Sequence, residues 1–237
     1  MLASAKIGGK DVVAVKKKGR RELIYDHIIH SRLYDDSIYT KQYWDYLLPL
    51  AAVFEKPKIL VIGLGGGTIP FQIMKKFGNR ATIDVVEIDR EMVRLSKAFL
   101  PEKLEANIVI GDGYAYLSDK KAVYNVIIAD PYISGEIPDE FFQNNFIENA
   151  NNALKENGIL GINYALTIRA LSRRSDLVRK LRKAFSVYTI NYPRSSGNAI
   201  LVCSKKYKID KINDRITDNF PKDGENGFLF KAYSKAR

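Results

Sequence analysis

The chain has 237 residues, 46% of them hydrophobic and 27% charged, a composition typical of a globular protein with one large core, or one core and a small appendage. The single cysteine excludes an internal disulfide, and two histidines give no constellation typical of zinc. No apolar run approaches the ~20 residues that span a bilayer, and the first residues lack the apolar region of a signal peptide. We therefore expect a cytoplasmic protein without a membrane segment or a bound metal.

The formal net charge is +11, and much of it lies in residues 16–21, 169–183 and 205–237. Such runs usually form solvated faces and a basic tail, and an anionic partner such as nucleic acid is the alternative. Nucleic acid is not favoured, because the chain has no recognisable binding motif and no basic groove with interleaved aromatic residues.

Residues 1–45 are predicted to form a small β-hairpin region, since residues 11–15 and 22–30 are apolar or β-branched and a polar turn separates them. His27 and His30 lie on the second strand. A structural or exposed role is favoured for both, and the alternative is that His30 faces a cleft. Residues 37–50 have helical spacing and many aromatic side chains, so Tyr43 either packs the joint with the main sheet or lines a substrate site.

The stretch from Lys58 to Thr68 organises the rest of the chain. Residues 59–62 form a short apolar run typical of a buried parallel strand, and residues 69–77 have helical spacing. A glycine loop between such a strand and helix lets a ligand approach the backbone. A carboxylate that ends the next strand, as Glu87 does, usually binds ribose hydroxyls. The pattern predicts a nucleoside site formed by Gly63, Gly65, Gly66, Gly67 and Glu87.

A regular alternation of strands and helices follows, which indicates one doubly wound α/β domain over residues 46–205. Residues 206–237 form a basic tail that either folds back on this domain or packs on a second subunit. We expect helices at 90–100, 139–154 and 166–185, and strands at 107–110, 123–129, 158–163, 187–192 and 199–204.

Two further acids follow predicted parallel strands, so they meet Glu87 at the same edge of the sheet. Asp112, beside Gly113, suits the exocyclic amine of adenine, because a carboxylate accepts the hydrogen bond that this amine donates. Asp130 is placed to meet the reacting group, as a base or as a partner of a cation. The alternative for Asp130 is a turn cap before Pro131.

Taken together, these segments resemble the spermidine synthase (polyamine aminopropyltransferase) family within the S-adenosylmethionine-dependent methyltransferase folds, from about Tyr25 to Lys205. The resemblance lies in Val61-Ile-Gly-Leu-Gly-Gly-Gly-Thr68, Val86-Glu-Ile-Asp89, Gly111-Asp-Gly113, Tyr124-Asn-Val-Ile-Ile-Ala-Asp130, Ala153-Leu-Lys-Glu-Asn-Gly158 and Tyr192-Pro-Arg-Ser-Ser-Gly197. It implies a mostly parallel seven-stranded sheet with a reversed last hairpin, an N-terminal β-hairpin domain and a homo-oligomer.

The resemblance also assigns roles to single residues. It makes Glu87 the ribose ligand, Asp112 the adenine ligand and Asp130 the residue that accepts the proton of the nucleophile. Tyr132 and Tyr192 are, with Tyr43, candidates to line the substrate side.

The chain departs from the family pattern on the substrate side. Gly66 stands where the family has an aspartate that holds the terminal amine of decarboxylated S-adenosylmethionine, and Ile133 replaces a second acid after the fourth strand. The Tyr-His/Gln-Glu segment of the family fits Tyr43-Trp44-Asp45 only when the alignment is shifted. The acidic ring that grips a diamine is therefore expected to be largely missing.

Loss of the aspartate at Gly66 removes a like charge from the methionine carboxylate and leaves backbone N–H groups for it. We therefore expect an alkyl transferase that uses S-adenosylmethionine or its decarboxylated form and an unidentified acceptor, with methyl transfer slightly favoured. Aminopropyl transfer to a polyamine and a catalytically silent nucleoside-binding module are the alternatives. A nicotinamide-dependent oxidoreductase is disfavoured, because Thr68 stands where its fingerprint needs glycine.

Overall fold

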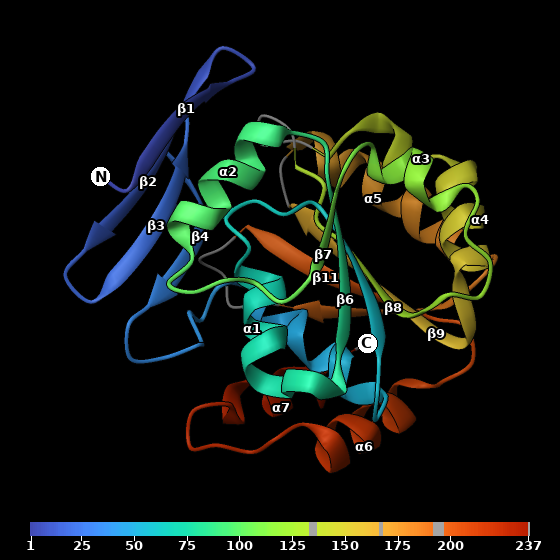
Figure 1. The fold of residues 1–237 in the computed structure, drawn as a ribbon. Coiled ribbons are helices and arrows are strands. Elements are labelled where there is room, and N and C mark those ends of the chain that lie inside the picture. The colour runs from blue at the N-terminus through green and yellow to red at the C-terminus, as the bar shows by residue number, and fades with distance from the viewer. Residues whose placement is uncertain (133–136, 166–167, 192–196, 237) are drawn as a thin grey trace.

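The structure is a computed structural model that describes residues 1–132, 137–165, 168–191 and 197–236. Its N-terminal strands form an antiparallel sheet in chain order, which stands beside the main domain (Figure 1). The predicted hairpin is therefore part of a four-stranded sheet. Its strands are β1 (Ala3–Ile7), β2 (Lys10–Lys17), β3 (Arg20–Tyr25) and β4 (Ile28–Tyr34).

The main domain contains a seven-stranded sheet in the order β10-β11-β9-β8-β5-β6-β7. The five strands from β9 to β7 run parallel. β11 pairs antiparallel to β9, and β10 pairs antiparallel to β11 at the edge of the sheet. This confirms the predicted doubly wound sheet with a reversed last hairpin. The strands are β5 (Lys58–Ile62), β6 (Thr82–Glu87), β7 (Asn107–Ile110), β8 (Tyr124–Ala129), β9 (Leu154–Ala165), β10 (Ser186–Asn191) and β11 (Asn198–Ser204).

Helices cover both faces of this sheet. α1 (Thr68–Phe77) and α2 (Arg90–Phe99) lie on the same side as the N-terminal sheet, whereas α3 (Gly113–Leu117), α4 (Asn144–Ala153) and α5 (Ile168–Leu181) lie on the other (Figure 1). Alternate residues of β5 point to opposite faces, so Ile59 and Val61 join the first core, and Leu60 and Ile62 join the second. Burial on both faces explains why Ile59 to Ile62 are all apolar.

Two predicted helices are shorter or tighter than expected. In place of a helix over residues 37–50, the chain forms the 3-10 helices η1 (Tyr43–Tyr46) and η2 (Leu48–Val53). Pro49 lies at the start of η2, where its missing N–H is tolerated. Another 3-10 helix, η3 (Gly78–Arg80), follows α1. The helix expected at 139–154 is divided into η4 (Asp139–Phe142) and α4, because Gln143 between them has an extended backbone.

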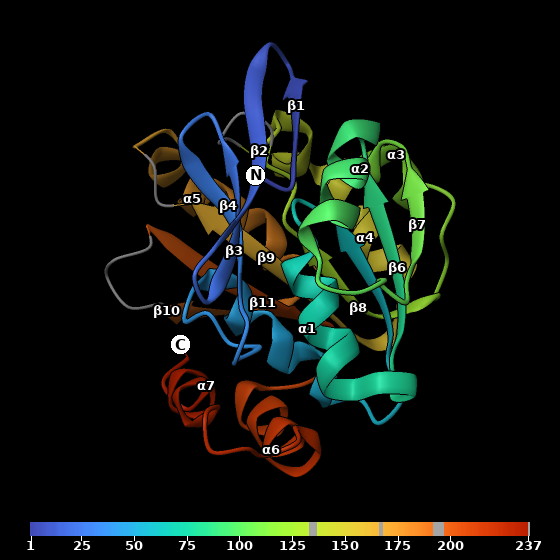
Figure 2. The same ribbon diagram turned by 60° about the vertical axis from the view of Figure 1, so that its left-hand side comes forward.

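The basic C-terminal segment folds back on the domain, which decides between the two alternatives for it. It contains α6 (Ile209–Asn219) and α7 (Gly227–Tyr233), which pack below α1 in Figure 2. The buried hydroxyl of Tyr233 donates a hydrogen bond of 2.7 Å to the backbone oxygen of Tyr46. The division of the chain at residues 46 and 206 stays a prediction. Within the described residues, no helix combines the length and the apolar character that crossing a bilayer requires.

We predict that Tyr233→Phe lowers the free energy of unfolding by about 1–2 kcal/mol, because the buried oxygen of Tyr46 loses its donor. Urea denaturation measures the change. Tyr188→Phe, on the partly exposed strand β10, is the control and should change stability by less than about 0.5 kcal/mol. Equal effects of the two substitutions would contradict a specific contact between α7 and η1.

Candidate active site

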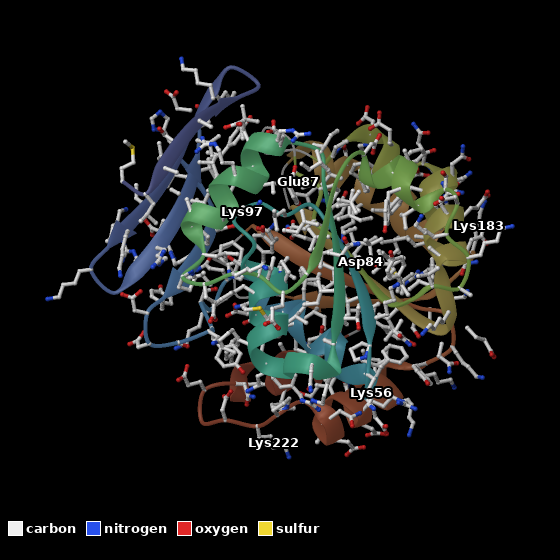
Figure 3. The ribbon with its side chains drawn as sticks, in the orientation of Figure 1. Lys56, Asp84, Glu87, Lys97, Lys183 and Lys222 are labelled. Carbon is white, nitrogen blue, oxygen red and sulfur yellow. The ribbon has the colours of Figure 1, made fainter. Side chains whose placement is uncertain are left out.

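A cavity of about 280 Å³ lies at the carboxyl ends of β5, β6 and β8, near the lower limit of typical small-molecule sites. The N-terminal sheet and η1 close it from one side, and the segment that contains η4 closes it from another. In Figure 3, the label of Glu87 shows where this cavity lies, between the N-terminal sheet and the main sheet. Asp84 lies nearer the start of the same strand, β6.

The structure brings most of the predicted site residues to this cavity. Gly66 and Gly67 belong to the same loop but do not line it, and Tyr192 lies outside the described residues. The ligand roles assigned from the sequence stay predictions. The predicted residues that line the cavity are Tyr43, Gly63, Gly65, Glu87, Asp112, Gly113, Asp130 and Tyr132.

Gly63 allows the ends of β5 and β8 to meet. Its φ of +89° is a conformation that favours glycine, and a Cβ atom there would lie only 2.4 Å from the backbone oxygen of Asp130. No larger residue fits without moving the strand ends apart. The glycine loop and Asp130 therefore share one wall of the cavity.

Glu87 holds the glycine loop in place. One carboxylate oxygen accepts a hydrogen bond of 2.8 Å from the amide of Leu64, and the other accepts one of 3.0 Å from the amide of Asp89. Burial raises the pKa of the Glu87 carboxyl, although backbone N–H groups oppose this effect. A carboxylate can accept about four hydrogen bonds, so Glu87 keeps acceptor capacity toward the cavity.

From the sequence, we expect the amides of the glycine loop to be free to bind a methionine carboxylate. This prediction is wrong for the amides of Gly66 and Gly67, which are paired within the protein. The amide of Gly66 donates to Ser31 Oγ at 2.8 Å, and that of Gly67 donates to the oxygen of Leu64 at 2.8 Å. A Cβ atom on Gly66 would meet Ser31 Cβ at 2.6 Å and Phe99 Cδ1 at 2.9 Å. Gly66 is therefore a close-packing position against β4 and α2, and an aspartate there would displace its neighbours.

Asp130 is the most perturbed acid of the cavity. Tyr43 donates its hydroxyl to one carboxylate oxygen at 3.1 Å, and the amide of Asn163 donates to the other at 2.7 Å. Burial raises the pKa of Asp130 to about 7, against the opposing effect of these two hydrogen bonds. Both oxygens thus have side-chain partners across the cavity wall, an arrangement that differs from the turn cap considered from the sequence.

Sequence reasoning missed Asn163. It is fully buried on β9, next to β8 in the sheet, and its own amide oxygen accepts a hydrogen bond of 2.9 Å from Asn198 on β11. This bond fixes which end of the Asn163 amide faces Asp130. A polar residue at the carboxyl end of an otherwise apolar parallel strand was the available signal.

His30 also lines the cavity, as the less favoured hypothesis had it. Its ring centre lies 5.2 Å from that of Tyr25, and its buried Nε2 atom has no hydrogen-bond partner among the described residues. Burial lowers the pKa of His30, so the ring is neutral at pH 7. His27, in contrast, is exposed at the turn between β3 and β4.

Asp112 lies at the exposed rim, where its carboxylate accepts a hydrogen bond of 2.8 Å from the amide of Tyr114 and caps α3. Ile88, with 56% of its surface exposed, and Met92 lie on the same side of the cavity. This part of the wall offers apolar contact beside one carboxylate, a combination that suits a nucleobase with an amino group.

The cavity is acidic. Among the described residues that line it, four are carboxylates (Glu87, Asp112, Asp130 and Glu140), none is lysine or arginine, and the one histidine is neutral. A low-dielectric site with this balance favours cationic ligands and disfavours anionic ones. No group of three or more potential metal ligands occurs in the described part of the chain.

We predict that titration with adenosine shifts the imidazole signals of His30 and leaves those of His27 unchanged, because only His30 faces the cavity. The chain contains just these two histidines, so ¹H–¹⁵N spectra can resolve both. A nucleoside that binds, as measured by calorimetry, without moving the His30 signals would show that it occupies another place.

Comparison with known proteins identifies the family of this chain. A family model described as the spermine/spermidine synthase domain matches residues 41–213. A polyamine aminopropyltransferase of Clostridium botulinum (strain Alaska E43 / Type E3) is 34% identical over 187 residues, which cover 70% of this chain and 62% of that protein. Polyamine aminopropyltransferase 1 of Aquifex aeolicus (strain VF5) is 30% identical over 203 residues, 80% of this chain and 70% of the relative.

The fold has a close match among solved structures. A spermidine synthase in complex with the transition-state analogue AdoDATO superposes with a TM-score of 0.73 at 19% identity, covering 98% of this chain and 82% of the other. The chain spans 62% of the length of the Clostridium relative, so it matches only part of that protein. The family model nevertheless covers most of the chain, and the chain belongs to the spermine/spermidine synthase family.

Proposed function

We propose that this protein transfers the aminopropyl group of decarboxylated S-adenosylmethionine to an amine of a polyamine. The acidic cavity carries the proposal. The donor has a sulfonium and an ammonium group, the acceptor is also cationic, and the described cavity wall has four carboxylates and no lysine or arginine. Both relatives named above are aminopropyltransferases.

The nucleoside half of the donor fits the wall formed by the glycine loop and the strand ends. Glu87 accepts hydrogen bonds from the ribose hydroxyls with its remaining acceptor capacity, and Asp112 accepts one from the adenine amine. Ile88 and Met92 contact the base. The neutral ring of His30 lines the same wall.

The reaction is an in-line displacement at the carbon next to the sulfonium. The acceptor nitrogen forms the new N–C bond, the C–S bond breaks, and its electron pair neutralises the sulfur of the departing methylthioadenosine. The proton lost by the amine passes to Asp130, whose pKa of about 7 suits a base at neutral pH. The leaving group is already activated, so most of the rate enhancement comes from positioning.

Methyl transfer, slightly favoured from the sequence, loses its main support. It rested on loop amides that were free to bind the methionine carboxylate, and the amides of Gly66 and Gly67 are engaged inside the protein. In the described cavity wall, that carboxylate would meet acids without a compensating lysine or arginine. A silent binding module is less favoured, because it would have no use for a buried Asp130 held by Tyr43 and Asn163.

Incubation with decarboxylated S-adenosylmethionine and putrescine or spermidine should yield methylthioadenosine and a polyamine that is heavier by one aminopropyl unit. Mass spectrometry detects both products. With ordinary S-adenosylmethionine we expect no methylated polyamine. The opposite pattern, a methylated acceptor formed only from ordinary S-adenosylmethionine, would refute aminopropyl transfer.

Asp130→Asn should lower kcat by roughly 10²-fold or more, because the amide cannot accept the proton. For the wild type, kcat/KM should fall as the pH drops through about 7, since the base must be ionised in the free enzyme.

Because burial raises the pKa of Asp130, ionisation of its carboxyl destabilises the folded protein as the pH rises from the pKa of the unfolded state toward 7. Asp130→Asn lacks this charge, so the variant should be at least as stable as the wild type at pH 8. Near-normal turnover by a folded variant would remove Asp130 from the mechanism.

The predicted homo-oligomer and cytoplasmic location stay predictions, as does the absence of a metal cofactor.

A further inference from the structure

The short helix η4 (Asp139–Phe142) sends three adjacent side chains in three directions at the entrance of the cavity. A 3-10 helix has three residues per turn, so consecutive side chains point about 120° apart. Phe141 and Phe142 are buried in the core on the α4–α5 face of the main sheet. Asp139 lies one turn before Phe142 and so on the same side of η4, whereas Glu140 points about 120° away from Asp139 and from Phe141.

Asp139 faces α5. Arg173 donates a hydrogen bond of 2.5 Å to its carboxylate and lies with its guanidinium 4.0 Å from the ring centre of Phe142. Lys180, about two turns further along α5, donates to the backbone oxygen of Phe142 at 3.1 Å. The contacts of Phe142 hold η4 against α5 from outside the cavity, whereas the Asp139–Arg173 pair is partly exposed and contributes little. The packing of Phe142 therefore sets the direction of the residue that follows Asp139.

That residue is Glu140, which lines the cavity. It is exposed, and no hydrogen bond or ion pair of its carboxylate occurs among the described residues. Asp139 does not line the cavity although it is the neighbouring acid. The cavity therefore has three carboxylates at the parallel strand ends, Asp130 among them, and a fourth, Glu140, on the η4 side of its wall, with no described lysine or arginine to neutralise them.

We propose that Glu140 binds the distal ammonium group of the acceptor while the reacting amine lies at Asp130. This inference rests on the proposed aminopropyl transfer and adds a residue that determines acceptor specificity. The second acid that the family pattern has after the fourth strand is absent from the sequence, where Ile133 stands. A carboxylate from η4 supplies the missing charge from another element, so the acceptor is a diamine or polyamine and not a monoamine.

The test compares Glu140→Gln with Asp139→Asn, two neutral isosteres at adjacent positions. Glu140→Gln should raise KM for putrescine or spermidine about tenfold and leave kcat within about threefold, because a charged hydrogen bond outside the reacting centre is lost. Asp139→Asn should change neither by more than about twofold. With propylamine, which has no second ammonium group, the wild type and Glu140→Gln should react equally poorly.

The outcomes separate this inference from the proposed function. A wild type that transfers aminopropyl groups, together with an unchanged KM of Glu140→Gln, overturns the role of Glu140 alone. The same rise in KM for Asp139→Asn overturns it too, because it would point to the position of η4 instead of a direct contact. A wild type that forms no aminopropyl product overturns the proposed function and this inference with it.

Discussion

The site depends on the bonds between the Glu87 carboxylate and the backbone around it. Its two oxygens accept the amides of Leu64 and Asp89, so the end of β6 holds both the glycine loop that follows β5 and its own turn into α2. Gly63 then lets the end of β8 approach this loop, which brings Asp130 to the same cavity. The buried carboxylate thus orders the loop at the place where the ends of β5, β6 and β8 line one cavity.

A cavity of this kind concentrates negative charge at a cost in stability. Burial raises the pKa values of both Glu87 and Asp130, which means that the empty protein holds these carboxylates in an unfavourable environment. A cationic ligand relieves that cost. The hydrogen bonds from Tyr43 and Asn163 keep Asp130 oriented without neutralising it. The arrangement therefore suits a reaction between two cations in which one of them loses a proton.

Sequence periodicity predicted the main sheet and most helices, because strands such as β5 are apolar on both faces and glycine or a capping acid marks their ends. Asp89 indeed caps α2 by accepting the amides of Glu91 and Met92. Tertiary features were not predictable in the same way. The pairing of the Gly66 amide with Ser31 joins residues 35 apart in the chain, and the direction of Glu140 depends on the contacts of α5 with Phe142 of η4. Local patterns carry no information on such partners.

The central claim is that the charge of the cavity selects the decarboxylated donor. Two like charges about 4 Å apart at an effective dielectric of about 20 repel by about 4 kcal/mol, and a quarter of that shifts a dissociation constant roughly fivefold. Isothermal titration calorimetry of the wild type with decarboxylated and ordinary S-adenosylmethionine measures this preference directly. The account predicts that the decarboxylated form binds at least fivefold more tightly. Equal or tighter binding of ordinary S-adenosylmethionine would contradict it.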